Sequence, residues 1–168
     1  MRLELSYDAE QSALQDSIAT LCERQGLGPQ FCDDEALPRE FWTGLGEIGV
    51  LGLGTEAGGG DVVEIAAAME TLGSFGAPGP LVATFCAGAL LDDDQLLGIA
   101  TGDTLVSVGA RGVYPWAPLA AILIELNDLH ACLVEPLEAM VPVESTAGEP
   151  WGEFTPRCIK ALGASSVA

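Results

Sequence analysis

Apolar residues recur at helical spacing from the start of the chain. Asp8 and Gln11 have the spacing of a capping box, in which each side chain bonds the other residue's main chain. Four apolar residues then share one stripe of a predicted first helix: Leu14, Ile18, Leu21 and Cys22. Their positions, i, i+4, i+7 and i+8, are those of a helix with one buried face.

The next apolar segment begins at Pro38, a residue that the first turn of a helix tolerates. Gly49 follows as a helix terminator. Between them, we expect four residues to face inward: Phe41, Trp42, Leu45 and Ile48. The pattern therefore predicts a second amphipathic helix between residues 38 and 49.

A third helix is predicted after the run Gly58-Gly59-Gly60, where Asp61 is a favourable N-cap. Its expected buried stripe has spacings of one, three and four residues: Val62, Ile65, Ala66, Met69 and Leu72. We read the glycine run itself as a turn between helices, because it lacks the spacing and the lysine of a phosphate-binding loop.

Two shorter helices are expected before residue 100. The breaker segment 76–80, Gly-Ala-Pro-Gly-Pro, precedes a helix with an inward stripe of Leu81, Phe85, Cys86 and Ala89. Asp92, Asp93 and Asp94 then open a short helix that buries Leu96 and Leu97, since acidic groups favour a helix start.

The period changes after Gly102. Residues 105–108 read as a strand, and two further runs, 121–126 and 129–134, flank the pair Asn127-Asp128, which predicts a β-hairpin. A further strand is expected at 139–143, and a weaker one near 154–159. We predict an α+β fold, with an all-helical domain over residues 1–100 and a small antiparallel β-domain over residues 101–168.

Charge and cysteine content restrict the class of function. The 168 residues are 49% apolar and carry 25 acidic against six basic residues, a net charge of -19. This balance argues against nucleic acid and against anionic membrane surfaces as partners, because both are bound through Lys and Arg. No run approaches the ~20 apolar residues of a membrane span. Five scattered cysteines without a C-x-x-C pair indicate reduced thiols, and we expect a cytoplasmic protein.

The candidate catalytic and metal-binding side chains have simpler explanations. His130, the only histidine, lies beside the predicted hairpin turn and reads as a surface or edge-strand residue. Asp92, Asp93 and Asp94 are adjacent and lack the spacing of a calcium loop, so they read as a solvated helix cap. From residue chemistry alone, we assign no catalytic, cofactor-binding or metal-binding residue.

The segment 38–53, PREFWTGLGEIGVLGL, nevertheless resembles the proline-led helix that is a signature of the acyl-CoA dehydrogenase family. An acidic, glycine-rich loop at 56–60 and the run Met69-Glu70-Thr71-Leu72-Gly73 follow in the family's order. The resemblance covers about residues 5–100. The shorter run Pro78-Gly79-Pro80-Leu81 is similar to members that act on bulky acyl-CoA substrates such as steroid side chains.

The resemblance implies three domains: N-terminal helices, a middle β-domain and a C-terminal four-helix bundle, assembled around FAD. It also implies a reaction in which a glutamate removes the α-proton of an acyl-CoA and the flavin takes a hydride from the β-carbon. An enoyl-CoA is the product.

This chain departs from the family where the chemistry occurs. Active members place "T-E-P-x-x-G-S-D" against the flavin, whereas residues 109–118 here read GARGVYPWAP. No "W-I-S/T" flavin motif follows, and the sequence ends before the bundle that carries the catalytic glutamate. Thr55-Glu56-Ala57 also stands where the family usually has proline and tyrosine.

We therefore expect a subunit that is inactive alone and belongs to a heteromeric, FAD-dependent acyl-CoA dehydrogenase. A full-length partner subunit would bind FAD and supply the base, and an acyl-CoA would be the substrate of the complex. Oligomerisation is expected because the apolar stripes of the third and fourth helices would otherwise be exposed. The alternatives are a structural or interaction protein derived from the family, and a fragment of an ordinary member.

Overall fold

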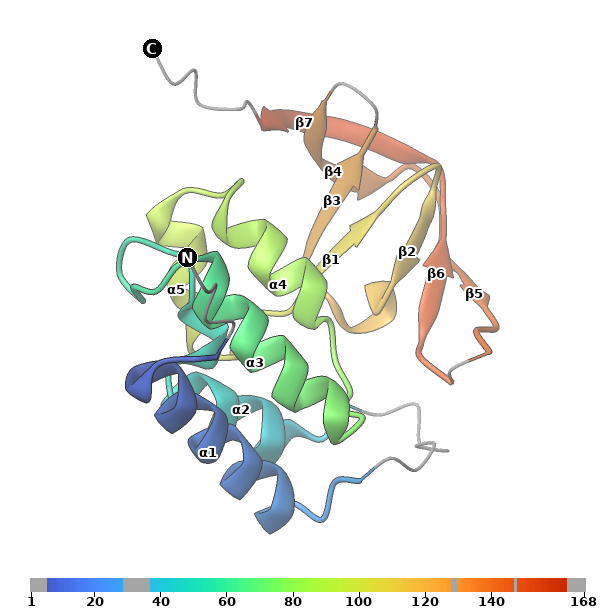
Figure 1. Cartoon of the computed structure of the whole chain (residues 1–168). Coiled ribbons are helices and arrows are strands. Elements are labelled where there is room, and N and C mark those ends of the chain that lie inside the picture. The colour runs from blue at the N-terminus through green and yellow to red at the C-terminus, as the bar shows by residue number, and fades with distance from the viewer. Residues whose placement is uncertain (1–5, 29–36, 128–129, 147, 163–168) are drawn as a thin grey trace.

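A computed structural model describes residues 6–28, 37–127, 130–146 and 148–162 of the chain. Helices come first and strands follow, and Figure 1 shows the helices gathered on one side of the molecule and the strands on the other. The predicted α+β fold is confirmed.

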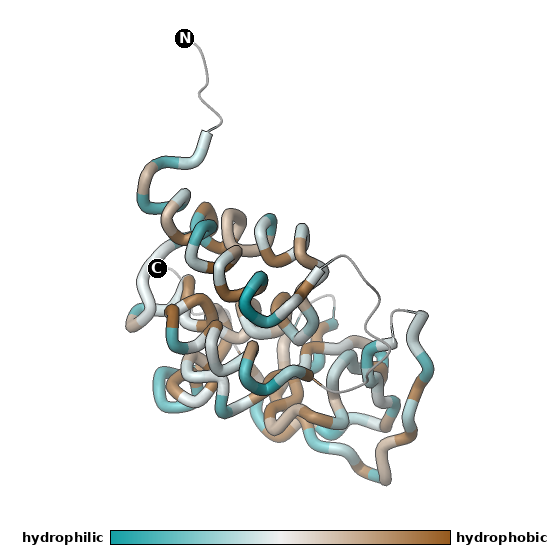
Figure 2. The backbone as a smooth tube through the Cα atoms, turned by 90° about the horizontal axis from the view of Figure 1, so that it is seen from below, coloured by the Kyte–Doolittle hydropathy of each residue, from teal (hydrophilic) through white to brown (hydrophobic). Residues whose placement is uncertain are grey.

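Five α-helices and a short 3-10 helix make up the helical part of the described chain. Their bounds are α1 Ala9–Arg24, α2 Arg39–Glu47, η1 Val50–Gly52, α3 Val62–Ser74, α4 Leu81–Gly88 and α5 Asp93–Ala100. Figure 2 shows hydrophobic and hydrophilic segments alternating along the helices, as expected when each has one buried face.

Side-chain caps fix the starts of α1 and α3. The predicted capping box is present: Gln11 N donates to Asp8 Oδ1 at 2.9 Å, and Asp8 N donates to Gln11 Oε1 at 3.0 Å. Asp61 caps α3 as predicted, and Glu64 completes a second capping box by accepting from Asp61 N at 2.8 Å. Gln11 Nε2 also donates to Glu64 Oε1 at 2.9 Å, so the two caps join α1 to α3.

The helical core matches the predicted faces of α1 and α2 in most positions. Ile18, Leu21 and Cys22 of α1 are buried, and Phe41 and Trp42 of α2 pack with them. Leu14 is half-buried at the edge of the same cluster. One apolar cluster therefore holds α1, α2, η1 and α3 together.

Other predicted faces were wrong at individual positions. Val62 is 75% exposed and Leu97 is 71% exposed, while Ile48 lies at the C-cap of α2 and is also exposed. Ala66 and Ala89 are exposed as well. Apolar residues surround most of α3, so its spacing fits more than one face, and the face that is buried carries Ala67, Ala68 and Leu72. Leu96 and Leu97 are adjacent on α5, where only one of them can face the core.

Seven strands form two sheets in the described part of the chain. The strands are β1 Val106–Gly109, β2 Val113–Pro115, β3 Ile122–Leu126, β4 Ala131–Pro136, β5 Val141–Val143, β6 Trp151–Glu153 and β7 Pro156–Leu162, with a 3-10 turn η2 Ala117–Leu119. The four-stranded sheet has the order β1-β3-β4-β7, and the three-stranded sheet has the order β2-β6-β5.

Strand pairing agrees only in part with the expected antiparallel domain. The β3–β4 hairpin is confirmed, although Asn127 N donates to His130 O, so the closing pair lies one residue later than expected. β1 and β3 are parallel, because β2 and η2 intervene and return the chain in the same direction. The predicted strands near 139 and 154 are present as β5 and β7, whereas β2 and β6 were missed.

Apolar contacts cross the predicted boundary at residue 100. Leu105 and Trp116 belong to the helical cluster, and a second cluster joins α4 and α5 to β1, β3, β4 and β7. The division into domains 1–100 and 101–168 remains a prediction. Within the described ranges, none of the helices has the length and apolar content that crossing a membrane would require.

Candidate functional site

An apolar cavity of about 390 Å³ lies where the helices meet the first strands. It is bordered by the middle of α3, by α4, by β1, and by the segment around Trp116. Its lining consists of Met69, Gly79, Pro80, Leu81, Val82, Ala83, Cys86, Val108, Pro115, Trp116, Leu126 and Glu149. This volume is within the usual range for a small-molecule pocket.

Two unusual backbone conformations shape the cavity. Gly79 has φ +126°, and a Cβ there would lie 2.5 Å from Trp42 Cζ3, so the turn before α4 requires glycine. Trp116 has φ +61°, which is uncommon for a residue with a side chain. Its main-chain N–H donates to Pro150 O at 2.7 Å, and its side chain is buried in the helical cluster. Trp116 thus fixes the β-part against the helices at the cavity wall.

Polar groups are few at this cavity. Glu149 is the acidic residue of the lining, and its carboxylate accepts from Trp151 Nε1 at 3.0 Å. Cys86 contributes a half-buried thiol. Such a lining can hold an apolar group by burial, but it presents no pair of groups arranged for acid–base chemistry.

The segment 109–118 forms a tight hairpin between β1 and β2. Ala110 and Val113 exchange main-chain hydrogen bonds of 3.2 Å, and the two residues between them, Arg111 and Gly112, both have positive φ. This is the geometry of a type I′ turn. A Cβ on Gly112 would lie 2.8 Å from Phe154 O, so the turn also packs against the segment that follows β6.

Glu125 of β3 holds this hairpin in place. Its carboxylate accepts from Arg111 N at 2.7 Å and from the Tyr114 hydroxyl. The Tyr114 ring is fully buried and stacks on Phe154 with centroids 4.4 Å apart. Burial first, and then the Glu125 hydrogen bond, raises the pKa of Tyr114 far above its usual value.

These contacts bear on whether the segment fits a flavin. The family's motif at this place offers hydroxyls and main chain to the cofactor. Here the Tyr114 hydroxyl is bound by Glu125, and the Ser107 hydroxyl donates to Pro115 O at 2.5 Å. The hydroxyls of the hairpin region are therefore hydrogen-bonded within the chain itself.

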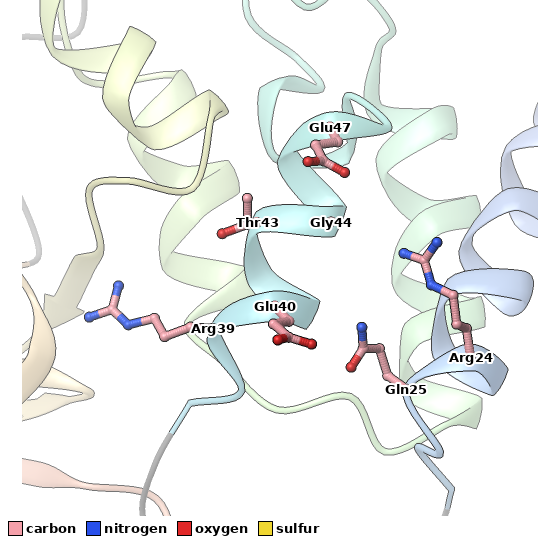
Figure 3. Close-up of a pocket in the computed structure, with 7 residues that line it drawn as sticks. All are labelled: Arg24, Gln25, Arg39, Glu40, Thr43, Gly44 and Glu47. Atoms are coloured by element: carbon pink, nitrogen blue, oxygen red, sulfur yellow. The ribbon is translucent and has the colours of Figure 1, made fainter.

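A second hollow, of about 600 Å³, lies between the end of α1 and α2. Figure 3 shows Arg24 and Arg39 pointing to opposite sides of α2, with Glu40 between them. The remaining lining residues are Gln25, Thr43, Gly44 and Glu47. Because the two cations do not converge, the hollow is a surface of mixed charge and not an anion site.

The residues singled out from sequence are not brought together. His130 is exposed and donates its main-chain N–H to Asn127 Oδ1 at 3.0 Å. Asp92 starts α5 and accepts from Lys160 Nζ at 2.6 Å. Among the described residues, no group of three or more His, Cys, Asp or Glu side chains could hold a metal ion. Cys32 lies outside the described residues.

The cavity residues were missed by sequence reasoning. They come from α3, the turn before α4, β1 and the segment around residue 149, which are distant in the chain. The one local signal was the breaker segment 76–80, which was interpreted as a helix terminator and, through Pro78-Gly79-Pro80-Leu81, as a resemblance to members that act on bulky acyl-CoA substrates. Its second glycine, Gly79, and its second proline, Pro80, line the cavity.

Comparisons with known proteins agree with this architecture. The profile of the acyl-CoA dehydrogenase N-terminal domain matches residues 8–93, just over half of the chain. No curated protein sequence matches.

Three solved structures are similar in fold. The ChsE4-ChsE5 complex from Mycobacterium tuberculosis has a TM-score of 0.68 at 15% identity, over 97% of this chain and 59% of that one. A variant of the steroid ACAD Tcur3481-Tcur3483 has a TM-score of 0.66 at 17% identity, over 92% of this chain and 57% of that one. The FAD complex of PigA has a TM-score of 0.66 at 15% identity, over 96% of this chain and 58% of that one. The chain thus spans less than two thirds of these relatives.

Proposed function

Because this chain belongs to the acyl-CoA dehydrogenase family, we propose that it is a non-catalytic subunit of a heteromeric, FAD-dependent acyl-CoA dehydrogenase in the cytoplasm. A partner subunit of the same family binds the flavin, which accepts a hydride, and supplies the glutamate base. The complex converts an acyl-CoA into the enoyl-CoA. Similar folds are found in the ChsE4-ChsE5 complex and in Tcur3481-Tcur3483, whose names show two components each.

The β1–β2 hairpin is the observation that carries this proposal. Its turn, Arg111-Gly112, is held by Glu125, and the nearby hydroxyls of Ser107 and Tyr114 are engaged within the chain. Opening the two bonds to Glu125 to receive a flavin would cost hydrogen bonds to a charged carboxylate, each worth about 1.5–3 kcal/mol. A chain built this way is better suited to supporting a partner than to holding the cofactor.

Exposed apolar side chains favour a partner surface on the helical part. Val82 of α4 is 65% exposed, and Val62 and Leu97 are also exposed. Val62 belongs to the stripe expected on the third helix and remains a candidate contact residue, whereas Leu72 and Leu81 of the expected stripes are buried in this chain. Val82 and Leu97 are added as candidates because they are exposed. With a net charge of -19, the chain favours a partner that presents basic groups around its contact surface.

The apolar cavity narrows the ligand class of the complex. Its lining would suit the apolar portion of a bulky acyl group, and the relative Tcur3481-Tcur3483 is described as a steroid ACAD. We propose that an acyl group of this kind, and not a short polar one, is the substrate of the complex.

Isolation of the protein with its natural partners tests the proposal. The chain purified alone should be colourless. Material isolated from its natural source should contain a second acyl-CoA dehydrogenase subunit together with stoichiometric flavin, measured by native mass spectrometry and the absorbance spectrum. Val82→Ser should weaken the association, whereas Thr43→Ser, a change on the exposed face of α2, should not. Stoichiometric flavin on the chain alone would refute the proposal, and a flavin-free partner of another family would favour the structural alternative.

A further inference from the structure

Two cysteines lie on neighbouring strands of the four-stranded sheet. Cys132 is in β4 and Cys158 is in β7, which pair antiparallel. The register pairs Leu133 with Lys160 and Val134 with Cys158. Ile159 of β7 is therefore the extra residue of a β-bulge, opposite the step from Leu133 to Val134 in β4.

The register places both thiols on one face of the sheet. Residues two apart on a strand share a face, so Cys132 points to the same side as Val134. Directly paired residues share a face too, and the pairing of Val134 with Cys158 therefore brings Cys158 to that side. The two thiols contact each other, and this contact is the largest of the influences that raise the pKa of Cys132.

The two thiols differ in their exposure to solvent. Cys158 is exposed and Cys132 is half-buried. The diagonal separation on a sheet is about 7–8 Å between backbones, slightly beyond the usual reach of a disulfide. Among the described strands, however, β7 lies at the edge of its sheet and has β4 as its one neighbour. An edge strand with a bulge can shift toward its neighbour without breaking hydrogen bonds to a strand on its other side.

We propose that Cys132 and Cys158 form a redox-sensitive pair that low-molecular-weight disulfides oxidise to a disulfide between β4 and β7. The thiolate of Cys158 attacks one sulfur of the reagent, forms a mixed disulfide and releases one thiolate. Cys132 then loses its proton to solvent and attacks the Cys158 sulfur, which releases the second thiolate. Two protein thiols are oxidised, and one reagent disulfide is reduced to two thiols. This inference does not depend on the proposed function.

Oxidised glutathione and trypsin provide the test on the full chain. After oxidation and blocking of free thiols, cleavage at Arg111, Arg157 and Lys160 gives a peptide 112–157 with Cys132 and a tripeptide 158–160 with Cys158. We expect these two peptides to be joined, with the loss of two hydrogen atoms. Because Cys132 has a raised pKa, closure should accelerate as the pH rises.

Matched variants assign the reaction to the pair. Cys132→Ser should leave glutathione attached to Cys158, and Cys86→Ser should leave the cross-link unchanged. Amide hydrogen exchange along β7 should slow in the oxidised wild-type protein, because the strand is tied to β4. Persistent glutathione on Cys158 of the wild-type protein, or a disulfide between two copies of the chain in place of the internal one, would overturn the proposal.

Discussion

Replacing Tyr114 with phenylalanine removes the hydroxyl that donates to Glu125 and keeps the ring that stacks on Phe154. A hydrogen bond to a charged group contributes about 1.5–3 kcal/mol. Glu125 is half-buried and keeps its bond from Arg111 N, so water can partly replace the lost donor. We therefore expect the lower end, a loss of about 1.5 kcal/mol in the free energy of unfolding, or about 3–6 °C in Tm.

The loss of stability caused by Tyr114→Phe should become smaller at high pH. Burial and Glu125 raise the pKa of Tyr114 above its ordinary value of 10.0. The native state therefore keeps the phenol proton after the unfolded state has lost it, so the stabilisation is complete below pH 10 and declines above it. The difference in stability between wild type and Tyr114→Phe should shrink as the pH rises from 10. Urea unfolding followed by circular dichroism at several pH values measures this difference.

A double-mutant cycle with Glu125→Gln isolates the interaction. The two single changes should be non-additive by about 1 kcal/mol, since either one removes the charged hydrogen bond. Strict additivity, or a Tyr114→Phe variant as stable as wild type at neutral pH, would show that Glu125 does not hold the hairpin as described.

Two further perturbations test the packing of the helical part. Hydrogen bonds from Gln11 and the Asp61 main chain lower the pKa of Glu64 to about 2. The lowered pKa stabilises the fold above the unfolded value of 4.5, and this stabilisation is lost as the pH falls toward 2. The urea midpoint of Glu64→Gln should therefore vary less between these pH values than the midpoint of wild type. Gly46→Ala should destabilise the fold by about 1–3 kcal/mol, because its Cβ would lie 2.5 Å from Thr101 O. Gly73→Ala has open space around the new Cβ and should stabilise the fold by about 0.5–1 kcal/mol. Equal Tm shifts in the two variants would contradict the close contact between α2 and the end of α5.

The helix starts were predictable because their signals are local. Asp8 with Gln11, and Asp61 before α3, act within one turn of the chain. Buried faces were less predictable, because α3 is apolar nearly all round and its packing against α1 selects the face with Ala67 and Ala68. Val62 was therefore placed inside although it is exposed.

The strands and the cavity depend on distant contacts. β2 and β6 have three residues each and contain proline or glycine, so no alternating pattern marks them. The parallel pairing of β1 with β3 depends on the path of the segment between them. Trp116 belongs to the helical cluster and has a left-handed backbone conformation, which no sequence signal near it predicts.

Single-turnover flavin reduction in the reconstituted complex tests the non-catalytic role most directly. The acids to replace by glutamine are Glu149 at the cavity and those near the family motif, Glu56, Glu64 and Glu70. We predict that each variant, once assembled with its partner, reduces the flavin at the wild-type rate, because in the proposed function the partner subunit supplies the base. A drop of about a thousandfold with assembly unchanged, equivalent to roughly 4 kcal/mol of transition-state stabilisation, would show that this chain supplies the base.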